Sequence, residues 1–255
     1  MNAFEYTKEL ISSIFSCELE GKVVTIIAPS GMGKTTFSAM QLPTYLYLRL
    51  KQSGTLNDNV KLFIFNTDDS LFNDRFLQLL SSFEISYSEI RKYVRIEQID
   101  NFDKQHSYLT YVIPKIIEEK KADVRYIVVD PFNHLLRKRF AETKYEFRLN
   151  VTGRLSPMLE HQVIQLMQIA RKYNIPVLLT LLPKKQYADK VPTNWQNAYF
   201  GPLEIAHCSD IVLWFSYSQK SDAKISIHVK KHRLKEEGEV FHANIRDFGL
   251  ELVKE

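Results

Sequence analysis

An eight-residue segment near the N-terminus has the residue types and spacing of a phosphate-binding loop. It matches the pattern G-x-x-x-x-G-K-[ST], with Ala28 in place of the first glycine. Two glycines let successive backbone N–H groups turn toward an anion at the start of a helix. We therefore expect Mg·ATP to bind here, with the Lys34 ammonium on the β- and γ-phosphates and the Thr35 hydroxyl on Mg²⁺. The expected ATP-binding residues are Ser30, Gly31, Met32, Gly33, Lys34, Thr35 and Thr36.

A carboxylate that could complete such a site follows about a hundred residues later. The apolar run RYIVVD (125–130) ends in Asp130, and an acid at the tip of a strand holds the Mg²⁺ of many NTPases through water. Taken alone, each feature has a simpler interpretation. A glycine-rich strand–helix turn need bind nothing, and an aspartate at the end of a strand is common. Together they predict a nucleotide site.

The elements that would position these residues alternate along the chain. Continuous apolar runs predict buried strands at 22–28, 61–67, 94–99, 125–130 and 174–182. Helical spacing follows at 34–50, 71–83, 112–121 and 156–173, with Ser156 as the expected N-cap and Pro157 in the first turn of the last helix. Such alternation predicts an α/β fold with a mostly parallel central sheet covered by helices on both faces.

The last fifty residues have a different pattern. Short apolar segments at 211–218, 224–231 and 239–245 are joined by polar turns, which predicts antiparallel hairpins added to the sheet. No repeat, low-complexity segment or Pro/Gly-rich linker interrupts the sequence, so a single domain over 1–255 is expected, with an N-terminal helix within 1–20. The polar segment 183–197 is expected to be a long loop at the carboxyl end of a strand, where open parallel sheets bind ligands.

Beyond the P-loop, the order of several segments resembles the ATPase core of the RecA/RadA recombinases, and most closely the archaeal RadA paralogues (RadB- or RadC-like). The resemblance extends from about residue 18 to the C-terminus. It rests on NTDDSLFNDR (66–75), DPFNHLLR (130–137), IARKYNIPVLLT (169–180), GPLEIAHCSD (201–210) and KKHR followed by EGEVFHANIRDFGLEL. It implies a P-loop NTPase fold of the RecA type and an ATPase acting in homologous recombination and DNA repair, with Lys34, Asp68 and Asp130 as catalytic residues.

The chain also departs from that family. The position of the family's catalytic glutamate holds Asp68, one methylene shorter, with Asp69 as an alternative and a helix N-cap as the simpler interpretation. Leu181-Leu182 replaces a polar pair whose glutamine senses the γ-phosphate. Only about twenty residues precede the core, so no separate N-terminal DNA-binding domain is expected. None of the 16 phenylalanines has alanine three residues later, so the family's polymerisation motif is missing and a long self-filament is not expected.

Two basic segments carry aromatic residues. Residues 134–154 have a net charge of +4, equal to that of the whole chain, and correspond by resemblance to the first DNA-binding loop; the second loop is 183–200. Lysine and arginine follow phosphates while aromatic rings stack on bases, as single-stranded DNA requires. The simpler interpretations are a solvated helix face, in which Arg137 to Arg139 cap a helix, and a surface loop with buried aromatics. The expected DNA-binding residues are Arg148, Arg154, Lys184, Lys185, Tyr187, Lys190 and Trp195.

A third basic segment lies near the end of the chain. Lys231-His232-Arg233 resembles the Lys-x-Arg finger that related ATPases insert into a neighbour's active site, where the arginine stabilises charge on the γ-phosphate. An exposed basic strand end beside the acidic turn at 235–239 is the alternative interpretation.

Composition limits the other possibilities. A chain with 45% apolar and 25% charged residues is neither disordered nor fibrous, and no apolar run would span a bilayer. Cys17 and Cys208 lack the spacing of a disulfide scaffold or a zinc site, so a cytoplasmic location is expected.

These observations favour a RadA-like paralogue that binds Mg·ATP and single-stranded DNA, hydrolyses ATP slowly and assists a RadA-type recombinase. Two alternatives stay open. One is a KaiC-like regulatory ATPase that binds a protein partner, and the other is a nucleotide-binding scaffold without turnover. The basic aromatic loops favour DNA over the first alternative, whereas Asp68 and Leu181-Leu182 keep the second open.

Overall fold

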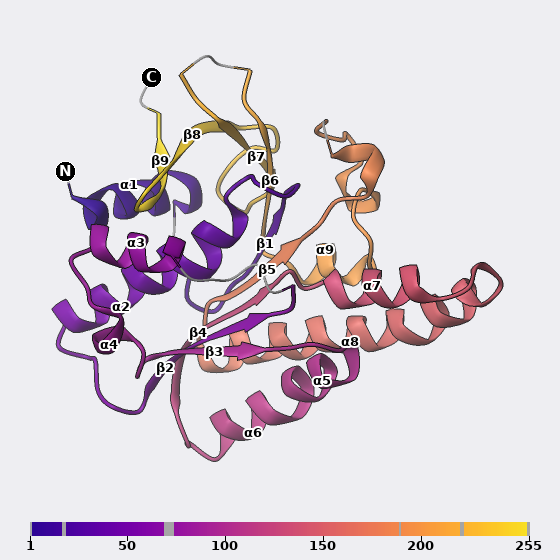
Figure 1. The fold of residues 1–255 in the computed structure, drawn as a ribbon, viewed down its shortest axis with the longest axis horizontal. Coiled ribbons are helices and arrows are strands. Elements are labelled where there is room, and N and C mark those ends of the chain that lie inside the picture. The colour runs from indigo at the N-terminus through magenta and orange to yellow at the C-terminus, as the bar shows by residue number, and fades with distance from the viewer. Residues whose placement is uncertain (1, 17–18, 69–73, 189, 220–221, 254–255) are drawn as a thin grey trace.

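One nine-stranded sheet runs through the part of the chain that the structure describes (Figure 1). The computed structural model describes residues 2–16, 19–68, 74–188, 190–219 and 222–253. The strand order is β3-β2-β4-β5-β1-β6-β7-β8-β9. The strands are β1 Val23–Ile27, β2 Val60–Asn66, β3 Val94–Gln98, β4 Asp123–Asp130, β5 Val177–Leu181, β6 Ile211–Tyr217, β7 Ile225–Lys231, β8 Val240–Arg246 and β9 Gly249–Leu252.

The sheet has a parallel half and an antiparallel half. β3, β2, β4, β5, β1 and β6 all pair in parallel, and β6 to β9 pair antiparallel. This arrangement confirms the predicted α/β fold with C-terminal hairpins. The last strand, β9, was not expected, because its four residues include a glycine and a glutamate and lack a clear alternation.

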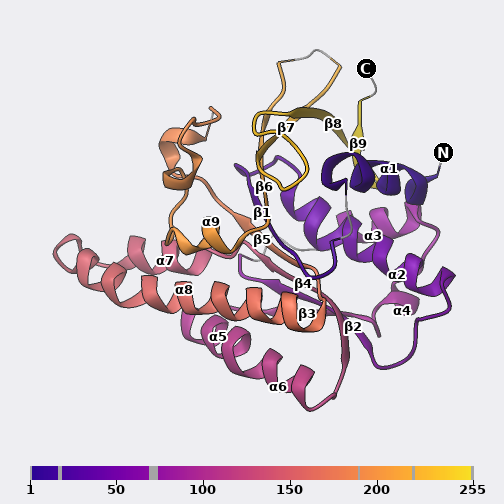
Figure 2. The same cartoon turned by 180° about the vertical axis from the view of Figure 1, so that it is seen from behind.

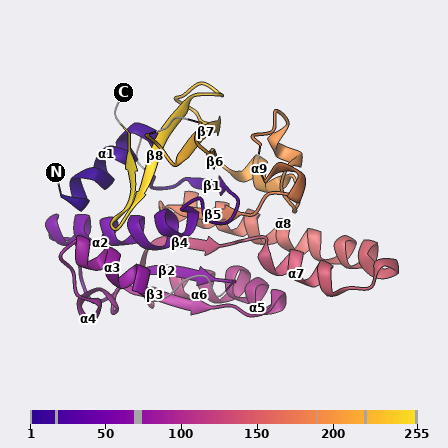
Figure 3. The ribbon, with the colours of Figure 1, turned by 45° about the horizontal axis from the view of Figure 1, so that its top comes forward.

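Helices cover both faces of the sheet, as the fully buried β1 and β5 require (Figure 3). One face packs against α1 Ala3–Phe15, α2 Leu42–Gln52, α3 Asp74–Ser82 and α4 Tyr87–Ile90. The other packs against α5 Phe102–Ser107, α6 Ile113–Glu118, α7 His134–Glu142, α8 Arg148–Tyr173 and α9 Glu204–Cys208. Each face therefore has its own apolar core. Of the predicted helix 71–83, residues 71–73 lie outside the described part of the chain, as do Cys17 and Asp69.

The helix predicted to begin at Ser156 begins eight residues earlier. α8 runs through Pro157, so the prediction of Ser156 as N-cap was wrong. A proline inside a helix frees the carbonyl four residues before it, here that of Gly153. Gly153 and Pro157 both lie on the exposed face, where water can bind that carbonyl, while Leu155 and Leu159 bury the opposite face. The helix therefore continues across the proline.

Two helices widen into π turns just before a proline. The turns η1 Thr36–Gln41 and η2 Tyr108–Val112 each end two residues before one, Pro43 and Pro114 respectively. In a regular α turn the proline ring meets the carbonyl four residues back, and a wider turn relieves that clash. η1 directly follows the phosphate-loop segment, so Pro43 shapes the helix on which the loop rests.

The side chain of Gln41 joins that same helix to the last strand. Its Nε2 donates to the Leu250 carbonyl at 3.0 Å and to the Thr7 hydroxyl at 2.9 Å, and its Oε1 accepts from the Leu250 N–H at 2.8 Å. A Cβ on Gly249 would lie 2.3 Å from the Gln41 amide carbon. The amide therefore pairs with β9 as a neighbouring strand would.

Candidate functional site

The phosphate-loop segment lies between the end of β1 and the start of a helix, as its sequence predicts. The Ala28 N–H donates to the Leu181 carbonyl at 3.1 Å, and the first helical hydrogen bond runs from the Phe37 N–H to the Gly33 carbonyl at 2.9 Å. Gly31 and Gly33 have φ values of +83° and +73°, which side-chain-bearing residues rarely adopt. A Cβ on Gly33 would also lie 2.8 Å from Leu250 Cδ2. The loop therefore has the glycines, and the helix N-terminus, of an anion-binding turn.

Lys34 lies in the interior of this site, with 6% of its surface exposed. Burial lowers the pKa of Lys34, and the charge of Arg137 adds to that effect. The carboxylates of Asp130 and Asp68 oppose it. A buried ammonium needs nearby anions to stay charged. The two carboxylates provide part of this compensation, and a bound phosphate would provide more.

Asp130 ends β4 beside the loop and is completely buried. Its Oδ1 accepts a short hydrogen bond from the Thr180 hydroxyl of β5, whereas its Oδ2 has no hydrogen-bond partner among the described residues. Burial raises the pKa of Asp130, against the opposing effects of Thr180, Thr35 and Lys34. An unpartnered buried carboxylate oxygen is costly, and a hydrated cation would satisfy it.

The donor set suits Mg²⁺ bound together with a nucleotide. Mg²⁺ is usually held by one or two carboxylates, a hydroxyl and substrate phosphates, with several waters retained. Thr35 and Asp130 would hold it here, and the ion would neutralise charge on the phosphates. No cluster of three or more histidine, cysteine, aspartate or glutamate side chains, which could hold a metal without phosphate, occurs in the described ranges.

Asp68 lies at the same edge of the sheet, two residues after β2 ends. Its charge affects the pKa values of both Lys34 and Asp130, so it lies near both side chains. The Thr67 N–H donates to the Asp130 carbonyl at 2.9 Å, which fixes the chain just before it. The role of Asp68 in orienting a water molecule stays a prediction.

Sequence reasoning did not identify two residues that organise this edge. Thr180 holds Asp130, and Asn133 donates to the carbonyls of Leu182 and Phe200 at 3.0 and 3.1 Å while accepting from the Leu182 N–H at 3.0 Å. Their roles depend on which strands become neighbours, and no local motif marks them. Leu181 is fully buried in β5, so the apolar replacement at that position is part of the core.

The first basic segment forms a helical arm that projects from the sheet (Figures 1 and 2). It consists of α7, the short turn η3 Tyr145–Phe147 and the first half of α8. Its tip exposes Tyr145 at 86% and Leu149 at 85%. Arg148 lies 5.1 Å above the Phe140 ring and 5.8 Å above the Tyr145 ring, and its Nε donates to the Thr143 carbonyl at 3.2 Å. Arg148 therefore fixes the tip while its charge stays at the surface.

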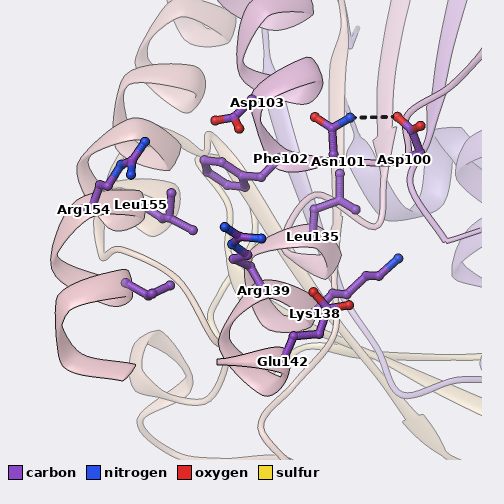
Figure 4. A pocket seen from close by; sticks show the side chains of 11 residues that line it. Asp100, Asn101, Phe102, Asp103, Leu135, Lys138, Arg139, Glu142, Arg154 and Leu155 are labelled. Atoms are coloured by element: carbon purple, nitrogen blue, oxygen red, sulfur yellow. Dashed lines mark hydrogen bonds between the residues drawn. The ribbon is translucent and has the colours of Figure 1, made fainter. Parts of the chain in front are cut away.

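A cavity of about 180 Å³ lies at the base of this arm (Figure 4). Side chains from the start of α5, from α7 and from α8 line it, and Arg154 faces it from α8. Its charged lining residues are Asp100, Asp103, Lys138, Arg139, Glu142 and Arg154. Cations and carboxylates are equal in number here, so the cavity has no strong preference for an anion.

The second basic segment, 183–200, lies beside the arm. The rings of Phe140 and Phe200 are 5.1 Å apart. Lys184 donates to the Asn197 carbonyl at 2.8 Å, and Lys190 lies 5.7 Å above the Tyr187 ring. The arm and this loop together form one basic, aromatic surface.

Trp195 does not lie on that surface. It begins the short turn η5 Trp195–Asn197 and is only 5% exposed, within the core beneath α8 and α9. Stacking of its ring on a base, as expected from the sequence, does not fit this position. The simpler interpretation of a loop with buried aromatics fits Trp195, because a large apolar ring is stabilised more by packing than by exposure.

Lys231 and Arg233 are engaged within the chain. Arg233 donates to Asp210 Oδ1 at 2.8 Å, and the other oxygen of that buried carboxylate accepts from the Val23 N–H at 3.0 Å. Lys231 donates to the carbonyls of Ala206 and His207 at the end of α9, at 2.9 and 3.3 Å. Arg233 therefore holds the amino end of β1 through Asp210, at the end opposite the phosphate loop, and Lys231 holds the end of α9.

No family model matches the chain. Proteins named DNA repair and recombination protein RadB are similar to it over nearly all of its length. The protein from Methanococcus maripaludis strain C7 is 23% identical over 245 residues, which cover 96% of this chain and 98% of that protein. The strain C5 protein is 24% identical over the same length. The crystal structure of the RadB recombinase matches with a TM-score of 0.66 at 20% identity, covering 96% of each chain.

The chain thus has the fold of the RadB recombinase. Similarity in sequence and in fold supports the resemblance to a RadA-like recombinase paralogue. No helix within the described residues is long and apolar enough to cross a membrane.

Proposed function

We propose that this chain, as a RadA-like recombinase paralogue, binds Mg·ATP and single-stranded DNA and assists a RadA-type recombinase in recombination and repair. One observation carries the nucleotide part of the proposal. The buried Asp130, whose Oδ2 finds no hydrogen-bond partner among the residues that the structure describes, lies beside Lys34 and Thr35 at a loop suited to an anion. The RadB names of its relatives support the recombination role.

ATP hydrolysis at this site is slow in our proposal. Asp68 would orient the attacking water, but its arm is shorter than a glutamate's and a water molecule must lie within hydrogen-bond reach. Leu181 and Leu182 offer no side-chain group that could respond to the γ-phosphate. ATP therefore acts mainly as a bound ligand, with turnover as a secondary property.

The nucleotide site is tested by titrating wild type and Lys34→Ala with ATP in the presence of Mg²⁺. The variant removes the buried ammonium, and we expect its ATP affinity to fall by at least about tenfold, as for the loss of a charge-assisted hydrogen bond. Full affinity in Lys34→Ala would contradict the nucleotide site. Turnover measured with and without single-stranded DNA then separates a slow ATPase from a scaffold that only binds.

The DNA surface is tested with a triple alanine variant of Lys184, Lys185 and Lys190. Loss of three phosphate contacts should weaken single-strand binding and reduce the slope of log K against log salt by about 2. The matched control replaces three exposed lysines on other elements, Lys92, Lys115 and Lys121, with the same change in net charge. Equal salt slopes in both variants would exclude the 183–200 loop, and binding of protein partners without DNA would favour the regulatory alternative.

A further inference from the structure

A pair of polar side chains closes β2 and β4 at the carboxyl edge of the sheet. Asn66 is the last residue of β2 and lies in register with Asp130, the last residue of β4. The next N–H along the chain, that of Thr67, donates to the Asp130 carbonyl at 2.9 Å. Both side chains are completely buried. Because paired strands lie about 5 Å apart, the two side chains are neighbours on the sheet.

Both side chains lie on the face of the sheet that carries the helix after the phosphate loop. The residues two positions earlier on each strand, Ile64 and Val128, pack in the core that contains residues of η1 and α2. Side chains two residues apart on a strand share a face. On that face the Tyr126 hydroxyl donates to the Ser38 carbonyl of η1. The strand ends and the phosphate-loop helix are therefore joined by direct packing.

Each of the two side chains has one atom held by a neighbouring strand. Asn66 Nδ2 donates to Gln98 Oε1 of β3 at 2.7 Å, and Asp130 Oδ1 accepts from the Thr180 hydroxyl of β5. The remaining atoms, Asn66 Oδ1 and Asp130 Oδ2, are buried and have no hydrogen-bond partner within the described ranges. Both are acceptors, so they cannot satisfy each other, and a water molecule can donate to both.

We propose that Asn66 is a positioning residue for the cation, whose Oδ1 and the Oδ2 of Asp130 together accept hydrogen bonds from the water around the Mg²⁺ of bound ATP. The inference rests on the proposed function, because it requires Mg·ATP at the phosphate loop. Mg²⁺ keeps several waters in sites of this kind. The amide of Asn66 adds an acceptor there without adding a second buried charge, which would be costly whenever the ion is absent.

The dependence of nucleotide affinity on Mg²⁺ tests this role. The affinity for a fluorescent ATP analogue is measured with saturating Mg²⁺ and with EDTA, and their ratio is the Mg²⁺ enhancement. Asn66→Leu keeps a similar shape without an acceptor, and it should reduce the enhancement about tenfold. Its affinity in EDTA should change by less than about threefold. Asn59→Leu is the matched control, exposed directly before the other end of β2, and should change neither value.

Asn66→Asp separates the oxygen from the nitrogen of the amide. The carboxylate keeps an acceptor but loses the donor to Gln98, so the Mg²⁺ enhancement should be at least as large as in wild type. Without nucleotide and with EDTA, the Tm of Asn66→Asp should fall below that of wild type, because a second carboxylate is then buried beside Asp130. Saturating Mg²⁺ and ATP should restore most of that loss.

The outcomes separate this inference from the nucleotide site itself. An unchanged enhancement in Asn66→Leu, or equal losses of affinity with Mg²⁺ and with EDTA, would overturn the inference while the phosphate loop stands. An enhancement lost in Asn66→Asp would also overturn it, and this variant decides the matter if Asn66→Leu does not fold in a thermal unfolding scan. If wild type binds ATP in neither condition, the proposed function fails and the inference fails with it.

Discussion

The two oxygens of Asp130 have separate environments. Thr180 satisfies Oδ1, whereas Oδ2 is buried with no hydrogen-bond partner in the described part of the chain, and burial raises the pKa of this carboxyl. A raised pKa means that the folded chain holds this proton more tightly than the unfolded chain does. Ionisation of Asp130 at neutral pH therefore destabilises the nucleotide-free fold, and cation binding reverses that loss.

Asp130→Asn should stabilise the nucleotide-free protein. The amide keeps an oxygen for the Thr180 hydroxyl and carries no charge to bury. At pH 7 we expect a higher Tm, by about 2–4 °C for each kcal/mol gained. This difference from wild type should shrink as the pH falls toward the usual aspartate range, where wild-type Asp130 is protonated. Thermal unfolding at several pH values measures both effects.

The same variant should lose the Mg²⁺ dependence of ATP binding, because the carboxylate that holds the ion is gone. Asp123→Asn is the matched control, on the same strand but at its other end and paired with Arg125. An Asp130→Asn protein that is less stable than wild type at pH 7 would contradict our account of this carboxylate.

At the scale of elements, α8 shows how a helix can continue through a proline. Pro157 and Gly153 lie on one exposed face, and the buried stripe on the other continues from Leu155 to Ala170. The helix therefore loses one hydrogen bond without losing its packing. This continuity connects the arm to the core through a single helix.

Pro157→Ala should raise the free energy of unfolding by up to about 3 kcal/mol, because proline is that much less favourable than alanine inside a helix. At the first turn of a helix, proline has no such cost, so the result also tests where α8 begins. Ser156→Ala, the neighbouring position, should change stability by less than about 0.5 kcal/mol. No gain from Pro157→Ala would place the start of the helix near residue 156.

Sequence patterns predicted the helices and strands better than they predicted the contacts between them. The strands of the parallel half follow continuous apolar runs, and all of them were predicted within two or three residues. The start of α8 was wrong because Ser156-Pro157 imitates a cap, and β9 was missed because it is short. The phosphate loop and Asp130 carry local motifs. Thr180 and Asn133 matter only through strands that are distant in sequence, so no local motif indicated their roles.

At the scale of the whole molecule, charged side chains mark one of the two edge strands of the sheet. β3 lies at one edge of the sheet and carries the ion pair Arg95–Glu97, with 2.7 Å between Nε and Oε1. Charged side chains on an edge strand oppose pairing with another sheet. Arg233, which resembles the arginine of a trans finger, contacts Asp210 in its own chain. Both observations agree with the missing polymerisation motif.

We therefore expect no continuous filament on DNA. Sedimentation of the protein with Mg·ATP and a long single strand should give complexes whose mass rises in proportion to the protein added, without a cooperative step. The 183–200 triple variant is the control for DNA binding. Cooperative, ATP-dependent growth of the complexes, or filaments seen by electron microscopy, would contradict this expectation.

The hydrogen bonds between Gln41 and Leu250 have a consequence for biosynthesis. The phosphate loop is translated about two hundred residues before β9. The Gln41 amide nevertheless hydrogen-bonds to Leu250 of that strand, and the Leu250 side chain lies against Gly33. In a nascent chain that has emerged only as far as β6, the Gln41 amide can bond to Thr7 but lacks its partner Leu250. Nucleotide should therefore bind only after β9 has been translated. ATP then binds the completed fold and does not assist its formation.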